Sequence, residues 1–308
     1  MAILKYILKR LGQTLIVLFF VSLFAFFIIR LAPGNPARMV LPDGATEEQV
    51  AAMEVKLGLD RPLYEQYLKY ISGILHGDLG VSAAYGTSCK DLIFGRLPAT
   101  IKLAVSTYII ALLIAIPLGI AAGSHQGSFR DFCAMLFALI GQSMAPLWLG
   151  VLLMYIFGVK LGWLPTMGYG GILYLIMPAF ALGYPNASQL TRLCRSSMID
   201  ILHEDYITAT YAKGMSPRKV NTKYAFKNAL IPIVTMVGMD MGVLLTGAVV
   251  IETVFSWPGI GQLSFQAIGN RDYQLVQSIL LVSASLIALV NLLVDIINSF
   301  IDPRVSLE

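Results

Sequence analysis

Long apolar segments alternate with short polar ones along most of the chain. The first follows a basic start, since residues 1–10 carry three lysines and arginines and residues 11–29 have no charged side chain. A signal peptide would have an apolar core of about 7–15 residues followed by a cleavage site of small residues. This segment is longer and continues into Arg30, so it predicts an uncleaved first membrane helix over residues 1–31.

Five more apolar segments follow, and each is long enough to cross about 30 Å of hydrocarbon. They cover residues 98–123, 132–157, 172–193, 229–251 and 275–301. Pro178 and Pro185 are expected to interrupt the 172–193 helix, because proline lacks the backbone N–H that a helix needs. Pro117, Pro146 and Pro232 lie in or at the ends of other segments, where they are expected to kink or start helices. The pattern predicts an all-α, polytopic membrane protein with six transmembrane helices.

A polar stretch separates the first two apolar segments. Residues 32–97 hold eight acidic and six basic side chains. Thr46 precedes two glutamates, as a capping residue precedes a helix, and apolar residues recur at helical spacing from Leu63 onward. We therefore expect an extracytoplasmic helical insert over residues 32–95 and a five-helix core over residues 96–301.

Lysine and arginine gather in one loop, residues 194–228, which carries six of them. Loops on the cytoplasmic side of a membrane are enriched in these residues. The polar stretch 32–97 has a net charge of −2 and falls on the opposite side. The distribution predicts that both termini and the 194–228 loop lie in the cytoplasm.

Composition supports a membrane location. The chain is 57% hydrophobic and 13% charged, whereas soluble domains carry about 25% charged residues. The net charge of +4 is small and gives no reason to expect a nucleic-acid partner. The three cysteines lie far apart, without metal-ligand spacing, and are expected to be unpaired thiols that fill space.

The chain lacks the motifs of a catalytic protein. It has no GxxxxGK[ST] phosphate loop, and its three histidines are scattered, with no cysteine or carboxylate at ligand spacing. Asp240 and Asp295 are the acids placed well inside apolar segments, one in each, and would form a catalytic pair only if those helices met there. We therefore expect no catalytic residue, no metal site and no cofactor bound by this chain.

The polar segment 204–232 has a specific pattern, which reads EDYITATYAKGMSPRKVNTKYAFKNALIP. It resembles the EAA loop of ABC importer permeases, and most closely that of the dipeptide, oligopeptide and nickel branch. Six further stretches agree with the branch in order along the chain: RLAPGNP at 30–36, LPAT at 97–100, GWLPTMG at 162–168, VIETVFSWPGIG at 250–261, NRDY at 270–273 and DPR at 302–304. Within the first of these, Asn35 stands where that branch usually has aspartate.

The resemblance implies the type I ABC importer permease fold, in which loop 194–228 holds a short coupling helix that sits on a separate ATPase subunit. Small residues there would let a partner backbone approach closely. Gly214 is expected to end the helix, and Ser216 with Pro217 to start the next one. The basic residues after the turn could instead serve only to set topology. The coupling residues implied by the resemblance are Asp205, Tyr206, Ala209, Ala212, Lys213, Gly214, Met215 and Ser216.

The resemblance also implies partners and a cargo. The partners would be a second homologous permease chain, two cytoplasmic ATPase subunits that bind ATP and Mg²⁺, an extracytoplasmic solute-binding protein, and the lipid of a bacterial or archaeal cytoplasmic membrane. The cargo would be a di- or oligopeptide, with nickel or a metal chelate as the alternative. An ion-coupled secondary transporter is a remoter alternative, because such proteins have inverted repeats and several intramembrane ionisable groups.

Asp240 is an acid that the branch pattern does not supply. An acid at mid-membrane costs roughly 3 kcal/mol or more on insertion scales, so it should face protein or water. We expect Asp240, Met236 and Met241 to line the substrate path. The alternatives for Asp240 are a structural pair, for example with Lys102, or a protonated carboxyl bonded to a neighbouring helix. For the methionines the alternative is simple packing. Asp295 shares its helix with two asparagines, which favours interhelical hydrogen bonding.

Glu252 and Trp257 stand at the start of the outer loop that follows the fifth apolar segment. We expect them to form an outer gate or a contact for the binding protein. The alternatives are that Glu252 is an ordinary acid at the interface and that Trp257 belongs to the aromatic belt found at bilayer surfaces.

Overall fold

The computed structural model describes residues 2–31, 38, 41, 44–57 and 60–301. The motif at 302–304 and parts of the motif at 30–36 and of the expected insert therefore lie outside the described residues. The described chain is helical, with one isolated β-bridge between Val81 and Ser88. The helices are α1 (Ala2–Leu31), α3 (Glu47–Leu57), α4 (Leu63–Leu75), α5 (Cys89–Ser124), α6 (Phe129–Ser143), α7 (Pro146–Leu153), η1 (Met154–Lys160), α8 (Ile172–Leu202), α9 (Asp205–Ala212), α10 (Pro217–Lys219), η2 (Val220–Ala225), α11 (Phe226–Leu245), α12 (Val249–Val254), α13 (Ile260–Gly269) and α14 (Tyr273–Ile301).

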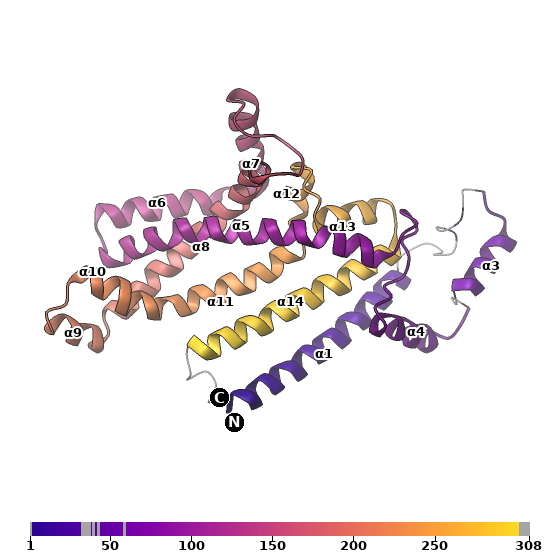
Figure 1. Cartoon of the computed structure of the whole chain (residues 1–308), viewed down its shortest axis with the longest axis horizontal. Helices are drawn as coiled ribbons and strands as arrows, with labels where there is room; N and C mark the ends of the chain where they lie inside the picture. Colours follow the sequence, from indigo (N-terminus) through magenta and orange to yellow (C-terminus); the bar gives the residue numbers. More distant parts are fainter. Residues whose placement is uncertain (1, 32–37, 39–40, 42–43, 58–59, 302–308) are drawn as a thin grey trace.

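Five long helices form an elongated bundle (Figure 1). α5 and α8 make the most extensive helix contact, α11 packs against both α8 and α14, and α14 also contacts α1. The short helices α9 and α10 lie at one end of the bundle, while α13 and α4 lie at the opposite end (Figure 1). The all-α class predicted from the sequence is confirmed.

Four helical segments of the described chain are long and apolar enough to cross a membrane, or five if the bent pair of α6 with α7 and η1 counts as one span. α8 is not among them, although it has 31 residues. The predicted number of six spans is therefore matched only in part. α8 differs from the others because its C-terminal half carries many polar residues.

The apolar segment predicted over 132–157 is bent sharply at Pro146, where the sequence predicts a kink or the start of a helix. α6 ends at Ser143, α7 begins at Pro146, and the two segments are bent by 97°. Ala145, which precedes the proline, has an extended backbone with φ −65° and ψ 135°. The proline ring disfavours helical geometry in the residue before it, so the helix ends and restarts in a new direction.

The prediction that prolines interrupt the 172–193 helix is wrong, because α8 runs unbroken through Pro178 and Pro185 to Leu202. Its small residues allow tight packing on α5. A Cβ on Gly183 would meet the Thr107 carbonyl, and Gly119 of α5 lies directly against Cys194. Packing against a neighbouring helix offsets the hydrogen bonds that the prolines cannot make.

The fifth apolar segment ends earlier than the predicted residue 251. α11 stops at Leu245, and the chain turns at Gly247, which has φ +103°. A Cβ at Gly247 would collide with the backbone of Gly261, so glycine is required there both for the conformation and for the close approach. α12 then starts a separate short element.

The helices expected in the insert are present as α3 and α4. Thr46 caps α3, since the N–H of Gln49 donates to its hydroxyl at 3.4 Å. After α4, the chain is attached to the bundle by the buried Asp272 carboxylate. This group accepts from the Ser82 hydroxyl, from the Ala84 N–H at 3.1 Å and from the Leu275 N–H at 3.1 Å. The insert is thereby held to the start of α14.

A buried ion pair joins α6 to α8. Arg195 donates from Nε to Asp131 Oδ1 at 2.5 Å and from an Nη to Oδ2 at 2.8 Å. Asp131 is 5% exposed and also accepts from the Gly127 N–H at 2.9 Å. Bidentate pairs of this kind fix geometry as well as adding energy.

Asp131→Asn is expected to lower the free energy of unfolding by about 1.5–3 kcal/mol, the contribution of hydrogen bonds to charged groups. Arg195 would keep its charge but lose its counter-ion. Thermal unfolding of the purified chain in detergent measures the effect. Asp200→Asn, at an exposed position of α8, is the matched control and should leave the unfolding temperature unchanged. Equal stability of the two variants would contradict a stabilising role for the pair.

Candidate functional site

The segment between α8 and α11 forms a helical hairpin at one end of the bundle (Figure 1). α8 ends at Leu202, α9 covers Asp205–Ala212, and Gly214 follows with φ +76°. Ser216 is the N-cap residue of α10, with Pro217 in the first helical position. The expected helix end at Gly214 and the expected start at Ser216 and Pro217 are both confirmed.

α9 is anchored by one side chain and presents the rest. Ile207 is 0% exposed and belongs to the cluster that includes Val220, Ala225 and Met198. Tyr206 is 42% exposed, and its hydroxyl accepts from Asn228 Nδ2 at 2.6 Å. The hairpin is therefore a fixed surface and not a free loop.

The sequence-predicted coupling residues lie together on this hairpin. Met215 is half-buried against the Ile207 cluster. The remaining seven are exposed, and they are Asp205, Tyr206, Ala209, Ala212, Lys213, Gly214 and Ser216. Ala209 and Ala212 are three residues apart and so share a face of α9, where their small side chains leave the backbone accessible.

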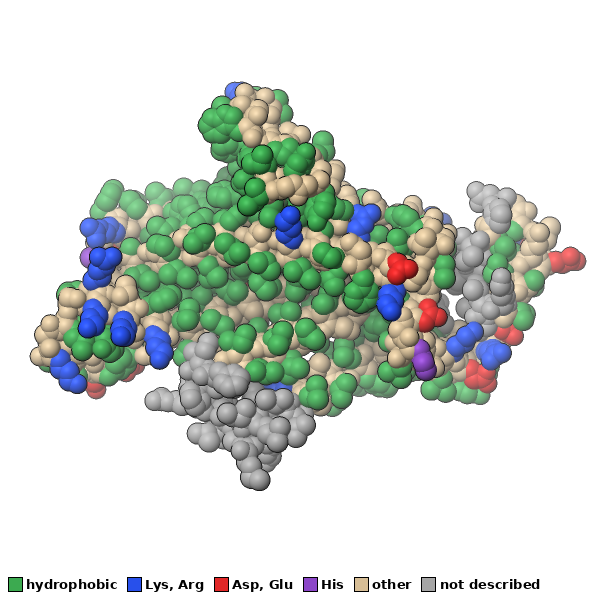
Figure 2. Space-filling model, in the orientation of Figure 1, with side chains coloured by type: hydrophobic (Ala, Val, Ile, Leu, Met, Phe, Trp, Pro, Cys, Tyr) green, Lys and Arg blue, Asp and Glu red, His purple; other side chains and the backbone are tan. Residues whose placement is uncertain are grey.

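Basic side chains gather at the same end of the molecule as α9 and α10, whereas acidic side chains are more frequent at the opposite end (Figure 2). A wide apolar surface lies between the two ends (Figure 2). This is the charge distribution that the positive-inside rule expects when the hairpin is cytoplasmic.

Asp240 is half-buried on α11 and lies beside the Tyr108 hydroxyl of α5. The alternative pair with Lys102 is wrong, because the Lys102 ammonium lies over the Tyr169 ring, 5.6 Å from its centre. Met236 and Met241 pack against the Ile207 cluster. Their expected place on a substrate path stays a prediction.

Asp295 makes an interhelical contact, as its sequence context favoured. Its carboxylate lies 3.2 Å from Arg10 Nε of α1. On the same helix, Asn298 donates to the Thr235 hydroxyl at 2.9 Å. The sequence does not predict the contact with Arg10, because no pattern in it shows which helices become neighbours.

The structure places Glu252 inside the protein, where it is 0% exposed. Its carboxyl accepts from the Thr100 hydroxyl of α5 at 3.2 Å and from the Gln262 N–H at 2.9 Å. Thr100 in turn accepts from the Ile260 N–H at 2.8 Å. This network, which we call the outer lock, joins α12 and the start of α13 to α5.

Trp257 completes the outer lock. It is 0% exposed, and its indole N–H donates to the Ala99 carbonyl at 2.9 Å. A Cβ on Gly259 or Gly261 would collide with the Glu252 carboxyl. The WPGIG stretch is therefore explained by close packing around one buried acid. Neither Glu252 nor Trp257 is exposed to a partner in this structure, and a gating role for them stays a prediction.

Burial raises the pKa of the Glu252 carboxyl, although the hydrogen bonds from Gln262 and Thr100 lower it in part. α12 lies outside the candidate membrane spans. The raised pKa means that the protonated form of Glu252 is favoured by folding.

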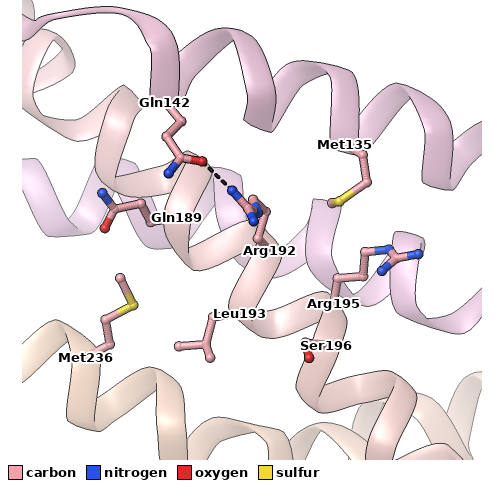
Figure 3. A pocket seen from close by; sticks show the side chains of 8 residues that line it. All are labelled: Met135, Gln142, Gln189, Arg192, Leu193, Arg195, Ser196 and Met236. Carbon is pink, nitrogen blue, oxygen red and sulfur yellow. Dashed lines mark hydrogen bonds between the residues drawn. The ribbon is translucent and has the colours of Figure 1, made fainter.

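A polar cavity of about 490 Å³ lies between α6, α8 and α11 (Figure 3). Arg192 of α8 donates to the Gln142 side chain of α6 within it. The sequence pattern does not predict this site, because its lining residues come from three helices that are separated along the chain. Within the described part of the chain, no three His, Cys, Asp or Glu side chains come together as metal ligands would. The cavity is lined by Met135, Gln142, Gln189, Arg192, Leu193, Arg195, Ser196 and Met236.

Two family models match the chain. Residues 115–307 match the model described as binding-protein-dependent transport system inner membrane component. Residues 3–106 match the N-terminal membrane component of the same transport systems. Together they cover nearly the whole sequence.

Curated relatives match along their full length. The dipeptide transport system permease protein DppB of Alkalihalophilus pseudofirmus is 38% identical over 98% of this chain and 99% of its own. The probable peptide ABC transporter permease protein y4tP of Sinorhizobium fredii is 39% identical over 97% of this chain and 98% of its own. The glutathione transport system permease protein GsiC of Salmonella paratyphi A is 38% identical over 98% of this chain and 99% of its own.

One solved structure shares the fold. A chain from the inward-facing MetNI methionine ABC transporter aligns with a TM-score of 0.57 and 17% identity, over 68% of this chain and 96% of that one. At that identity the likeness concerns the fold alone. It supports the arrangement of the helices and carries no information on cargo.

Glu252→Ala is expected to lower the free energy of unfolding by about 3 kcal/mol, because it leaves buried donors without an acceptor. Glu252→Gln is the matched variant, since its amide oxygen can still accept from the Gln262 N–H. Its free energy of unfolding should therefore fall much less. Thermal unfolding in detergent compares the two. Equal losses for both variants would show that the hydrogen bonds of the outer lock do not matter.

Stability should also depend on pH through Glu252. Because its pKa is raised in the folded protein, the stabilisation is full below the ordinary glutamate pKa of about 4.3 and is lost as the pH rises through the folded value. The unfolding temperature of the wild type should therefore fall as the pH rises across this window. Glu252→Gln should show a flatter profile. If the unfolding temperatures of the wild type and Glu252→Gln changed with pH in the same way, Glu252 would not be the group responsible.

Proposed function

The chain belongs to the family of binding-protein-dependent transport system inner membrane components, and we propose that it is the permease subunit of an ATP-driven importer of peptides. It is a multi-pass protein of the cytoplasmic membrane. The observation that carries the proposal is the match of both family models together with an exposed, anchored α9 at the basic end of the bundle.

Peptides are the cargo that the relatives favour. Full-length relatives at 38–39% identity are named as dipeptide, peptide and glutathione permeases. Glutathione is itself a peptide, so the three names describe one chemical class. Nickel or a metal chelate is not favoured as an alternative cargo.

The energy for transport must come from other subunits. The sequence has no phosphate loop, so ATP and Mg²⁺ would bind to two separate cytoplasmic ATPases that contact α9. A second, homologous permease would complete the membrane path, and an extracytoplasmic binding protein would deliver the peptide. α9 suits this contact because it is exposed, short and fixed to the bundle by Ile207.

We propose six membrane spans with both termini in the cytoplasm. α8 would be the polar span, tolerated because its polar face lies toward a watery path and not toward lipid. Asp240, Met236 and Met241 of α11 would lie along that path. At the outer end, Glu252 and Trp257 would support the rim that receives the binding protein by holding α12 and α13 in place.

In the proposed cycle, the ATPases act on the permease through α9. ATP-driven closure of the two ATPases would bring the α9 hairpins of the two permeases together and open the path outward. The binding protein would then release its peptide into the path. ATP hydrolysis would let the ATPases separate and return the path to the inward-facing state.

Ala209→Arg tests the proposed contact. The side chain is exposed, so the variant should fold, but its bulk would keep a partner from the backbone of α9. We expect at least a tenfold loss of ATPase subunits in pull-downs, which corresponds to about 1.4 kcal/mol, and a similar loss of peptide uptake.

Ala52→Arg provides the control. Ala52 is an exposed alanine in α3 at the other end of the molecule, so it receives the same bulk and charge in a helix. It should retain the ATPases. If Ala209→Arg also retained them, the ATPase contact would have to lie elsewhere.

A further inference from the structure

α8 carries a polar stripe on one face of its C-terminal half. Asn186, Gln189, Arg192 and Ser196 follow one another at intervals of three and four residues, which places them on one side of a helix. Three of them are exposed and Asn186 is half-buried. The residues of the opposite face, by contrast, are buried. A stripe that includes an arginine is too costly to face lipid, so it must face water or a partner.

Gln189, Arg192 and Ser196 of the stripe line the cavity between α6, α8 and α11 (Figure 3). Its volume of about 490 Å³ lies within the range of small-molecule sites, roughly 300–1,000 Å³. α6 contributes Gln142 and Met135, and α11 contributes Met236 (Figure 3). Small-molecule sites are mostly apolar, whereas five of the eight residues that line this cavity are polar, which favours a polar or charged ligand.

The charges in the cavity are not balanced. Arg195 is neutralised by its bidentate pair with Asp131. Among the interactions of the described residues, Arg192 bonds to the uncharged amide of Gln142 and has no carboxylate partner. Figure 3 shows this bond and the guanidinium beside the cavity. A guanidinium has five N–H donors, so most remain for a ligand.

Gln142 and Arg192 together favour a carboxylate. A guanidinium matches the two oxygens of a carboxylate with parallel hydrogen bonds, and the amide N–H₂ of Gln142 and the Ser196 hydroxyl can add donors. The terminal carboxylate of a peptide would therefore fit at Arg192.

We propose that this cavity is a substrate subsite in which Arg192 binds the terminal carboxylate of the peptide on its way through the membrane. Gln142 holds the guanidinium in position. The inference rests on the proposed function, since it names the part of the cargo that the permease itself recognises. It requires a free carboxylate and is independent of the side chains of the peptide.

The experiment uses the complete transporter, with its second permease, ATPases and binding protein, in proteoliposomes. The probes are a dipeptide of two alanines and its C-terminal amide, each at concentrations that saturate the binding protein. The measured quantity is the ratio of uptake rates for the acid and the amide. Selectivity of the binding protein is the same in every variant and cancels when these ratios are compared.

Arg192→Gln is expected to slow uptake of the acid about tenfold or more, equivalent to about 1.4 kcal/mol, while uptake of the amide changes little. Arg192→Lys keeps the charge but lacks the two parallel N–H donors of a guanidinium. Its rate of uptake of the acid should lie between those of the wild type and Arg192→Gln. Arg130→Gln removes the same charge from an exposed site at the start of α6, and it should leave the ratio unchanged.

Three results would overturn the subsite. Arg192→Gln could slow both probes equally, which would indicate a structural role, or it could change neither. The third result would be an effect of Arg192→Gln that is the same for both probes and appears in vesicles with phosphatidylglycerol but not in vesicles of phosphatidylcholine alone. That result would identify an anionic lipid headgroup as the ligand of Arg192. If the wild-type assembly took up no peptide at all, the proposed function itself would fail.

Discussion

The close approach of α5 and α8 is the contact on which the rest of the molecule depends. Gly119 and Gly123 of α5 lie directly against Cys194 and Met198 of α8, with no room for a Cβ. Gly183 of α8 meets the α5 backbone in the same way. In a membrane, helices gain little from the hydrophobic effect, so association depends on this kind of van der Waals packing between small residues.

That helix pair connects the two functional ends. The start of α5 carries Thr100, which holds the outer lock around Glu252. The end of α8 leads directly into α9, the proposed contact for the ATPases. Because one face of α8 is used against α5, its other face is left for the polar stripe around Arg192. The pair of α5 and α8 therefore links α9 both to the cavity and to the hydrogen bonds around Glu252.

Local sequence signals predicted the helices and turns well, because they depend on nearest neighbours. Gly214, Ser216 and Pro217 define their turn through φ preference and capping alone, and the structure agrees. Pro178 shows where such reasoning fails. Pro146 starts a new helix after an extended Ala145, as a proline is expected to do, whereas Pro178 lies inside an unbroken α8 that packs along α5. The pattern of residues does not show that packing.

The sequence by itself determined the class of the protein, its family resemblance and the segment proposed to contact the ATPases, since hydropathy, charge and a contiguous motif are all local properties. Only the tertiary structure decided which charges are satisfied. Glu252 was expected at an outer surface and is buried among donors from α5 and α13. Arg192 and Arg195 are three residues apart, yet one is paired with a carboxylate and the other faces a cavity. Partners for buried polar groups come from distant segments, and their positions follow from how the helices pack.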